Sequence, residues 1–238
     1  MNIKLDFKNI LFLDIETVPE TADFSDLSSL KQELFAKKTA YQRTEEQTPK
    51  DFYNRAGIWA EFGKIVCISV GYFSSTSEKR TFRITSFYND DETILLHQFK
   101  DLLDTHFYKK EHVLCGHNGK EFDFPFIARR MIINAISLPE KLNMFGKKPW
   151  EIPHIDTMEL WKFGDYKHYT SLKLLTEILG IPSPKDDIDG SQVGHVYYEE
   201  KNLERIKIYC EKDTLTVAQL LLRYNNEPLL SEDEIEII

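Results

Sequence analysis

The chain has 238 residues, of which 42% are hydrophobic and 29% are charged, and its formal net charge is −9. This length and apolar content fit one α/β domain with a large core. The negative charge argues against a protein that coats nucleic acid by bulk electrostatics, but not against an enzyme that engages a few phosphates at one cleft. Because the N-terminus is polar and no apolar run reaches about 18 residues, we expect neither a secretory signal nor a membrane span.

The three cysteines of the chain, Cys67, Cys115 and Cys210, are far apart in the sequence and show no C-x-x-C spacing. Such isolated thiols are typical of reduced core residues, and not of a disulfide or zinc framework. We therefore expect a cytoplasmic protein with free cysteines.

The first predicted element is an apolar strand over residues 9–17, followed by about 40 residues of different character. Helical spacing of apolar residues predicts a helix over 26–40. Thr48 followed by Pro49 is typical of an N-cap with proline at the first helical position, which predicts a short helix through residue 54. We interpret residues 20–58 as a helical insertion that packs near the end of the first strand, either as a lid or as a cover for the sheet edge.

The central part of the chain alternates between strands and helices. Residues 64–73 and 79–87 are predicted to form an antiparallel hairpin, because only a short polar segment joins them. The further expected elements are a helix from Asp90, a strand over 112–117 and a helix over 123–135.

The last third of the chain is expected to contain fewer strands. In order, we predict a loop over 136–153, a brief strand or turn over 155–160, a helix over 171–179, a polar loop over 182–198, a long helix over 202–224 and a frayed acidic tail.

Two carboxylates in the first strand are the first candidate functional residues. Side chains alternate along a strand, so Asp14 and Glu16 project from the same face, about 7 Å apart along the chain. Two like charges at the end of a buried strand repel and lose solvation, and a divalent cation between them removes both penalties. The same spacing recurs at Asp90 and Glu92, where acids favour the start of a helix. The spacing alone therefore leaves open a solvated strand end.

Two further motifs follow in the chain. The first runs from Asn118 to Asp123, and it places the aspartate at a loop-to-helix junction, where an N-cap is the alternative interpretation. The second consists of Tyr209 and Asp213, which are one turn apart and so share a face of the long C-terminal helix. An aspartate on an otherwise apolar helical stripe is costly unless a charged group faces it.

The order D-x-E, N-x-x-x-F-D and Y-x-x-x-D resembles the tyrosine subgroup of the DEDD exonuclease superfamily. Within it, the chain is most similar to the proofreading exonuclease domain of family-B DNA polymerases, here as a stand-alone protein. The resemblance covers residues 9–224, with 20–58 matching least. It implies one exonuclease domain over 1–238 with a ribonuclease H-like α/β fold, in which helices flank a mixed five-stranded sheet whose first three strands are antiparallel.

The resemblance also implies roles for individual residues. The metal ligands for two Mg²⁺ or Mn²⁺ ions would be Asp14, Glu16, Asp123 and Asp213. Tyr209 would complete the catalytic set by orienting the attacking water, and Thr17, Asn118 and Phe122 would contact the terminal nucleotide. Hard divalent ions prefer oxygen ligands, and a pair of them can activate water and neutralise the leaving 3′ oxygen. Phe122 has core packing as its alternative, and Asp156 is expected to serve a structural turn.

The expected function is a metal-dependent 3′→5′ exonuclease that releases nucleoside 5′-monophosphates from single-stranded nucleic acid, DNA more than RNA. One alternative is an RNA-directed, oligoribonuclease-like enzyme of the same superfamily. Another is a non-catalytic nucleic-acid-binding module, which we disfavour because a decayed site would be expected to lack at least one of the five catalytic residues.

Overall fold

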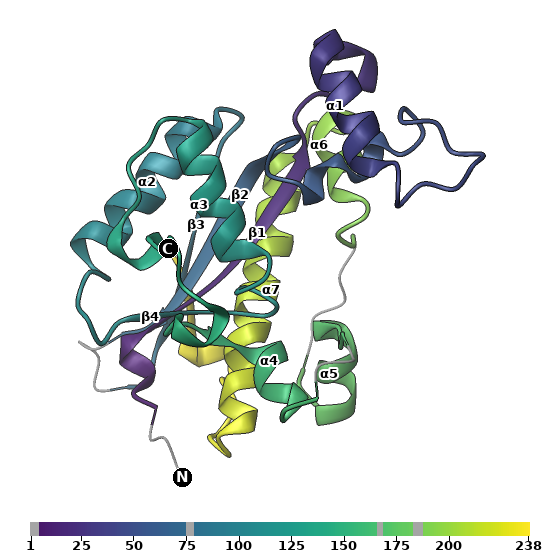
Figure 1. The fold of residues 1–238 in the computed structure, drawn as a ribbon. Helices are drawn as coiled ribbons and strands as arrows, with labels where there is room; N and C mark the ends of the chain where they lie inside the picture. The colour runs from purple at the N-terminus through teal and green to yellow at the C-terminus, as the bar shows by residue number, and fades with distance from the viewer. Residues whose placement is uncertain (1–4, 75–78, 166–168, 183–187) are drawn as a thin grey trace.

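A computed structural model describes residues 5–74, 79–165, 169–182 and 188–238. Its centre is a six-stranded mixed sheet with the order β5-β4-β1-β2-β3-β6 (Figure 1). The strands are β1 (Ile10–Pro19), β2 (Gly63–Phe73), β3 (Phe82–Tyr88), β4 (Val113–Gly116), β5 (Ile155–Asp156) and β6 (Ile235–Ile237). The first three strands are antiparallel neighbours, as predicted, whereas β4 is parallel to β1 and β5 is parallel to β4.

Helices cover both faces of this sheet. The helices of the described residues are α1 (Ser29–Thr39), α2 (Glu92–Thr105), α3 (Asp123–Ile133), α4 (Thr157–Lys162), α5 (Leu172–Leu179), α6 (Val193–Tyr198) and α7 (Leu203–Tyr224). In Figure 1, α7 runs along one face of the sheet, and α2 and α3 lie on the other. The fold is therefore the predicted ribonuclease H-like α/β arrangement, with one strand more than expected. Among the described residues, no helix combines the length and apolar character needed to cross a bilayer.

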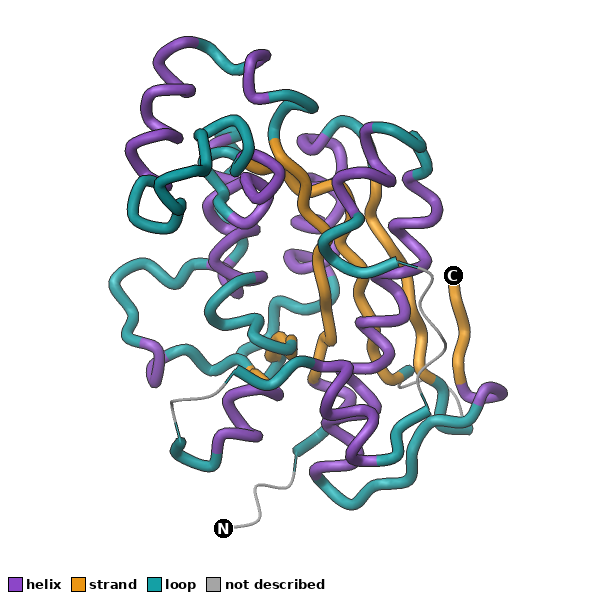
Figure 2. Tube along the Cα trace, turned by 90° about the vertical axis from the view of Figure 1, so that its right-hand side faces the viewer, coloured by secondary structure: helices purple, strands orange, loops and turns teal. Residues whose placement is uncertain are grey.

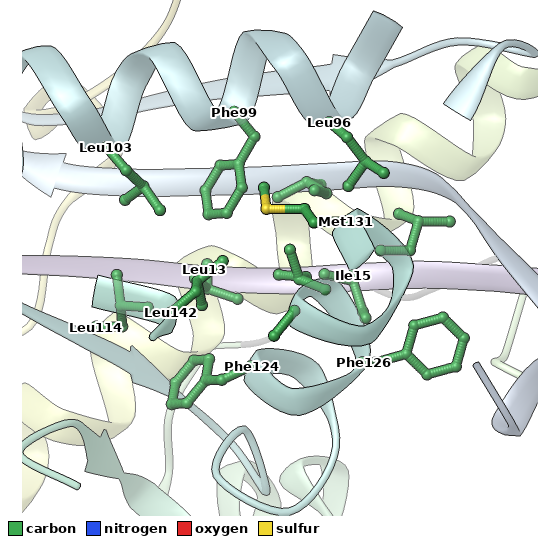
Figure 3. Packing of buried hydrophobic residues seen from close by; sticks show 14 of the residues in the cluster. Leu13, Ile15, Leu96, Phe99, Leu103, Leu114, Phe124, Phe126, Met131 and Leu142 are labelled. Carbon is green, nitrogen blue, oxygen red and sulfur yellow. The ribbon is translucent and has the colours of Figure 1, made fainter. Parts of the chain in front are cut away.

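The side chains of β1 alternate between two cores, as its sequence pattern requires. Leu13 and Ile15 point into the cluster shared with α2 and α3, where Figure 3 shows them close to Phe99 and Phe124. Phe12 points the other way, into the cluster formed with α7. The even-numbered positions that follow Phe12, which include Asp14 and Glu16, therefore face α7.

The C-terminal tail corrects one prediction, because it forms a strand and is not frayed. Residues 235–237 pair in parallel with β3 and give the sheet its sixth strand, at the edge of the sheet (Figure 2). Arg80 fixes this tail through two hydrogen bonds to Glu234, both of 2.8 Å. The partly buried Ile235 also packs against the α7 core. The acidic composition of the tail predicted fraying because it does not show that Arg80 pairs with Glu234.

The predicted polar loop over 182–198 was also wrong in part. Residues 183–187 lie outside the described residues, but 193–198 form α6. Val193 and Val196, three positions apart, are buried against Val18 and Ile206. This single apolar pair was too short a pattern to identify the helix from sequence.

The segment over 20–58 contains α1, and Thr48 forms the predicted cap by accepting a hydrogen bond from the Asp51 N–H, but the short helix predicted after it is wrong. Thr48 donates its hydroxyl to the carboxylate of Asp51, and turns lead into a 3-10 helix over Tyr53–Ile58. Six aromatic residues give the segment its own small core, with Phe35 fully buried at its centre. Gly57 lies so close to the backbone of Val18 that a Cβ would be only 3.1 Å away. The segment therefore packs near the end of β1, as predicted.

The segment predicted as a strand or turn over 155–160 divides between two elements. Only Ile155 and Asp156 pair with β4, and the helix α4 begins at the next residue. The carboxylate of Asp156 caps this helix by accepting hydrogen bonds from the N–H groups of Met158 and Glu159. The early appearance of this cap is why the strand is so short.

Candidate metal centre and active site

The site is built where β1 extends beyond its parallel neighbour. The pairing of β1 with β4 ends at Phe12, opposite Cys115, while β1 remains paired with β2 to Pro19, with a shift in register between Glu16 and Thr17. Asp14 and Glu16 therefore lie within the strand, and not at its end as predicted. They nevertheless lie beyond the last pairing with β4, where the β4-facing edge of β1 is available to other partners.

The first residue of α3 occupies this edge. Asp123 Oδ1 accepts a hydrogen bond from the backbone N–H of Ile15 at 3.2 Å, although 108 positions separate the two residues in sequence. Ile15 lies between the two acidic residues of β1, so this bond brings a third carboxylate beside them. It also gives a buried backbone donor the partner that it requires.

Together, Asp14, Glu16, Asp123 and Asp213 form what we call the acid cluster. Asp14 is partly buried, and Glu16 and Asp123 are only 7% and 4% exposed. Loss of solvation and then repulsion from the neighbouring acids raise the pKa of Asp14 and Glu16 well above their usual values, and the pKa of Asp123 to about 7. The charge of Asp213 contributes to all three shifts, so α7 brings the fourth acid close to the others.

Three acids of the cluster have no compensating cation in the described part of the chain. There, no lysine, arginine or histidine forms an ion pair with Asp14, Glu16 or Asp123. Their oxygen atoms are the donors that hard divalent ions prefer. The residues therefore fit a divalent metal centre, in which bound ions would supply the missing positive charge.

Tyr209 lies one helical turn before Asp213 on α7, close enough for the charge of Asp213 to act on its hydroxyl. Burial, and then the charges of Asp213 and of the two β1 acids, raise the pKa of this phenol well above its usual value. In the metal-free protein the phenol is therefore protonated at neutral pH. It can donate a hydrogen bond, but it cannot accept a proton as a base.

The sequence analysis missed Cys210, whose thiol points at Asp14. The sulfur lies 3.3 Å from the main-chain oxygen of Asp14 and 3.6 Å from its Oδ2. Ligand atoms of Asp14, Glu16 and Cys210 all lie within 4.8 Å of one another. Burial raises the pKa of the thiol, so its S–H remains a donor to Asp14. The spacing of Cys210 and Asp213, three positions apart on one helix, was the available signal.

Asp156 positions the loop that carries Asn118. Its carboxylate accepts the backbone N–H groups of Asn118 and Lys120, both at 3.0 Å, in addition to those at the start of α4. This confirms the structural turn role predicted for it. Asn118 has a left-handed backbone with φ 64°, and its buried Oδ1 has no hydrogen-bond partner among the described residues.

The other two predicted nucleotide contacts differ in their surroundings. Thr17 is partly exposed and follows a β-bulge between Glu16 and Thr17, one position beyond the acids. Phe122 is partly buried against the main core, with its ring 5.4 Å from that of Phe126. Core packing, the alternative for Phe122, is therefore present.

Two histidines near the site serve the structure. His117 contacts Thr157 Oγ1 and the main-chain oxygen of Thr170, both at 2.9 Å, and so ties the end of β4 to the segments that begin α4 and precede α5. His154 accepts from Leu114 N–H through Nδ1, and burial lowers its pKa to about 4.

A second residue missed in the sequence analysis is Tyr169, whose phenol pKa is raised by partial loss of solvation and by the charges of Asp123 and Asp14.

Comparison with known protein families gives one match. A family model described as a predicted 3'-5' exonuclease related to the exonuclease domain of PolB matches residues 58–234. The match includes the segments around Asp123 and Asp213, whereas β1 precedes it. No curated protein matches the chain. Because the matched residues make up well over half of the sequence, the chain belongs to the family of predicted 3'-5' exonucleases related to the exonuclease domain of PolB.

Proposed function

We propose that this chain is a divalent-metal-dependent 3′→5′ exonuclease that releases nucleoside 5′-monophosphates from single-stranded DNA. We assign it to the tyrosine subgroup of the DEDD superfamily, with residues 1–238 as one exonuclease domain and 20–58 as an insertion. The main support is the acid cluster, in which carboxylates from β1, α3 and α7 converge, and in which Asp14, Glu16 and Asp123 form no ion pair with a cationic side chain of the described residues.

In this proposal Asp14, Glu16, Asp123 and Asp213 hold two Mg²⁺ or Mn²⁺ ions. Bound divalent ions would supply Lewis-acid activation of water and would neutralise charge on the scissile phosphate and the leaving 3′ oxygen. The protein contributes by holding its four carboxylates in place before the ions arrive. The Ile15 N–H donates to Asp123 Oδ1 and the Cys210 S–H contacts Asp14 Oδ2, and these contacts help to fix the positions of two of the carboxylates.

Tyr209 is proposed to position the attacking water. Its protonated hydroxyl is close enough to Asp213, Glu16 and Asp14 for their charges to raise its pKa, which supports a place beside the acid cluster. Asn118, Thr17 and Phe122 are proposed to contact the terminal nucleotide. The strongest support is at Asn118, because its buried carboxamide oxygen has no partner within the described residues and a nucleotide could donate to it.

The test uses matched oligonucleotides of DNA and RNA, labelled at the 5′ or the 3′ end, with Mg²⁺, Mn²⁺ or EDTA. We expect a 5′-labelled DNA strand to shorten stepwise from its 3′ end only with metal, and a 3′-labelled strand to release labelled mononucleotide at once. Faster cleavage of RNA would overturn the substrate assignment. Activity in EDTA, or release of internal fragments first, would overturn the mechanism.

A further inference from the structure

The connection between α4 and α5 exposes two aromatic rings that the fold does not need for its core. Phe163 is 91% exposed and Tyr169 is 70% exposed. Phe163 also has a left-handed backbone, with φ 45°, where it ends α4. A bulky residue is disfavoured in that conformation, and an exposed ring gains little from burial in return. The combination points to a role for the ring outside the core.

Both ends of the connection are anchored to residues 117–121, the segment that leads into Asp123 of the acid cluster. Helix α4 is attached to the loop 118–122 by two ion pairs, Lys120 with Glu159 at 2.7 Å and Lys162 with Glu121 at 3.9 Å. Phe163 directly follows Lys162 and therefore lies at the end of α4 next to that loop.

Tyr169 comes close from the other end of the same connection. Its phenol is near enough to Asp123 and Asp14 for their charges to raise its pKa. The next residue is held to the end of β4 by the hydrogen bond from His117 to Thr170. Phe163 and Tyr169 thus stand next to the two points, Lys162 and Thr170, at which the connection is attached to the segment before Asp123.

Exposed aromatic rings next to lysines are typical of surfaces that bind single-stranded nucleic acid, because every base offers a face for stacking. We propose that Phe163 and Tyr169, with Lys162 beside them, form a stacking platform for the nucleotides on the 5′ side of the scissile phosphate. This inference rests on the exonuclease activity proposed above. Bases in a duplex are already stacked, so such a platform selects a single strand.

The test compares an intact DNA oligonucleotide with one that lacks the bases immediately 5′ of the terminal nucleotide. For the wild-type protein we expect kcat/KM to be about tenfold higher on the intact strand, since stacking on one aromatic ring is worth about 1–3 kcal/mol. Phe163→Ala and Tyr169→Ala should each reduce this ratio, and Phe163→Trp should retain it. The matched control is Tyr108→Ala, which removes an exposed aromatic residue from the connection into the start of β4, at the end away from the site.

The outcomes separate the two proposals. If the wild-type protein cleaves the intact strand but both alanine variants keep its full preference for that strand, the platform is refuted and the exonuclease activity stands. The same holds if Tyr108→Ala reduces the preference as much as Phe163→Ala. If the wild-type protein cleaves neither strand with Mg²⁺ or Mn²⁺, the proposed function itself fails. Circular dichroism of each variant checks that it is folded.

Discussion

Two groups of buried carboxylates in this molecule differ in how their charge is balanced. Glu92, at the start of α2, is 6% exposed and lies 2.5 Å from Arg130 Nη2. Its oxygens also accept from Ile65 N–H at 2.7 Å and from the Asn134 amide at 2.9 Å. In the acid cluster, Glu16 and Asp123 are buried to a similar extent and Asp14 is partly buried, but within the described residues these three acids have no cationic partner.

The Glu92 pair and the acid cluster serve different purposes. A buried charge is tolerated when the fold supplies its partner, as at Glu92, and that pair fixes α2 and α3 against β2. Where the fold supplies no cationic partner, as for Asp14, Glu16 and Asp123, the pKa of the acid is raised and its charged form destabilises the folded protein. A region of that kind is suited to a cation from solution.

The largest expected effect follows from removing one acid of the cluster. Asp14→Asn should lower kcat/KM by about three orders of magnitude, as for loss of a preorganised electrostatic group. In EDTA its melting temperature should hold or rise, because repulsion within the cluster is relieved. The control is Asp90→Asn, which alters the same D-x-E spacing at an exposed position near α2 and should change neither quantity. A clear loss of stability in the metal-free Asp14→Asn protein would contradict the unbalanced-charge account.

The opposite result is expected at the balanced carboxylate. Arg130→Met leaves Glu92 buried without its partner and should lower the free energy of unfolding by about 3–5 kcal/mol. Urea denaturation measures the loss, and adding Glu92→Gln to the same protein should recover much of it, because the buried charge is then gone. If the single and double variants are equally unstable, packing of the arginine and not its charge holds the helices.

The sequence was sufficient for the parts of the fold that depend on local pattern. Alternation along β1 correctly placed Asp14 and Glu16 on one face, and helical periodicity correctly placed Tyr209 and Asp213 together on α7. The convergence of these motifs with Asp123 depends on a hydrogen bond across 108 positions, which no local pattern contains. The sequence suggested it only through the order of the motifs and their family resemblance.

What the sequence analysis missed depends on contacts between distant segments. The tail appeared disordered because its acids repel one another in isolation, and their pairing with Lys79, Arg80 and Arg83 exists only after β3 is in place. Tyr169 has no motif at all, and its place beside the cluster follows from how the segment before α5 is attached to β4.

A third prediction concerns the pH dependence of stability in EDTA. Since the folded protein holds the pKa of Asp123 at about 7 and raises those of Asp14 and Glu16, it binds more protons than the unfolded chain above pH 4. This contribution to stability is complete below about pH 4 and is lost as the pH rises toward 7, by a few kcal/mol. Buried histidines with lowered pKa act in the opposite direction, so the measured quantity is the difference between wild type and Asp14→Asn. If the difference in stability between the two proteins does not change with pH, the pKa of Asp14 is not raised in the folded state.

The smallest effect separates positioning from metal binding. Tyr209→Phe removes the neutral hydrogen bond proposed to position the attacking water, worth about 1 kcal/mol, and should lower kcat several-fold while the Mn²⁺ titration midpoint stays unchanged. The ring that packs beside Cys210 is retained, so the melting temperature should change little. Asp213→Asn is the matched comparison one turn away, and it should weaken Mn²⁺ binding as well as turnover. An unchanged kcat in Tyr209→Phe would remove the phenol from the mechanism, and a shifted Mn²⁺ midpoint would instead make it a support for the carboxylate of Asp213.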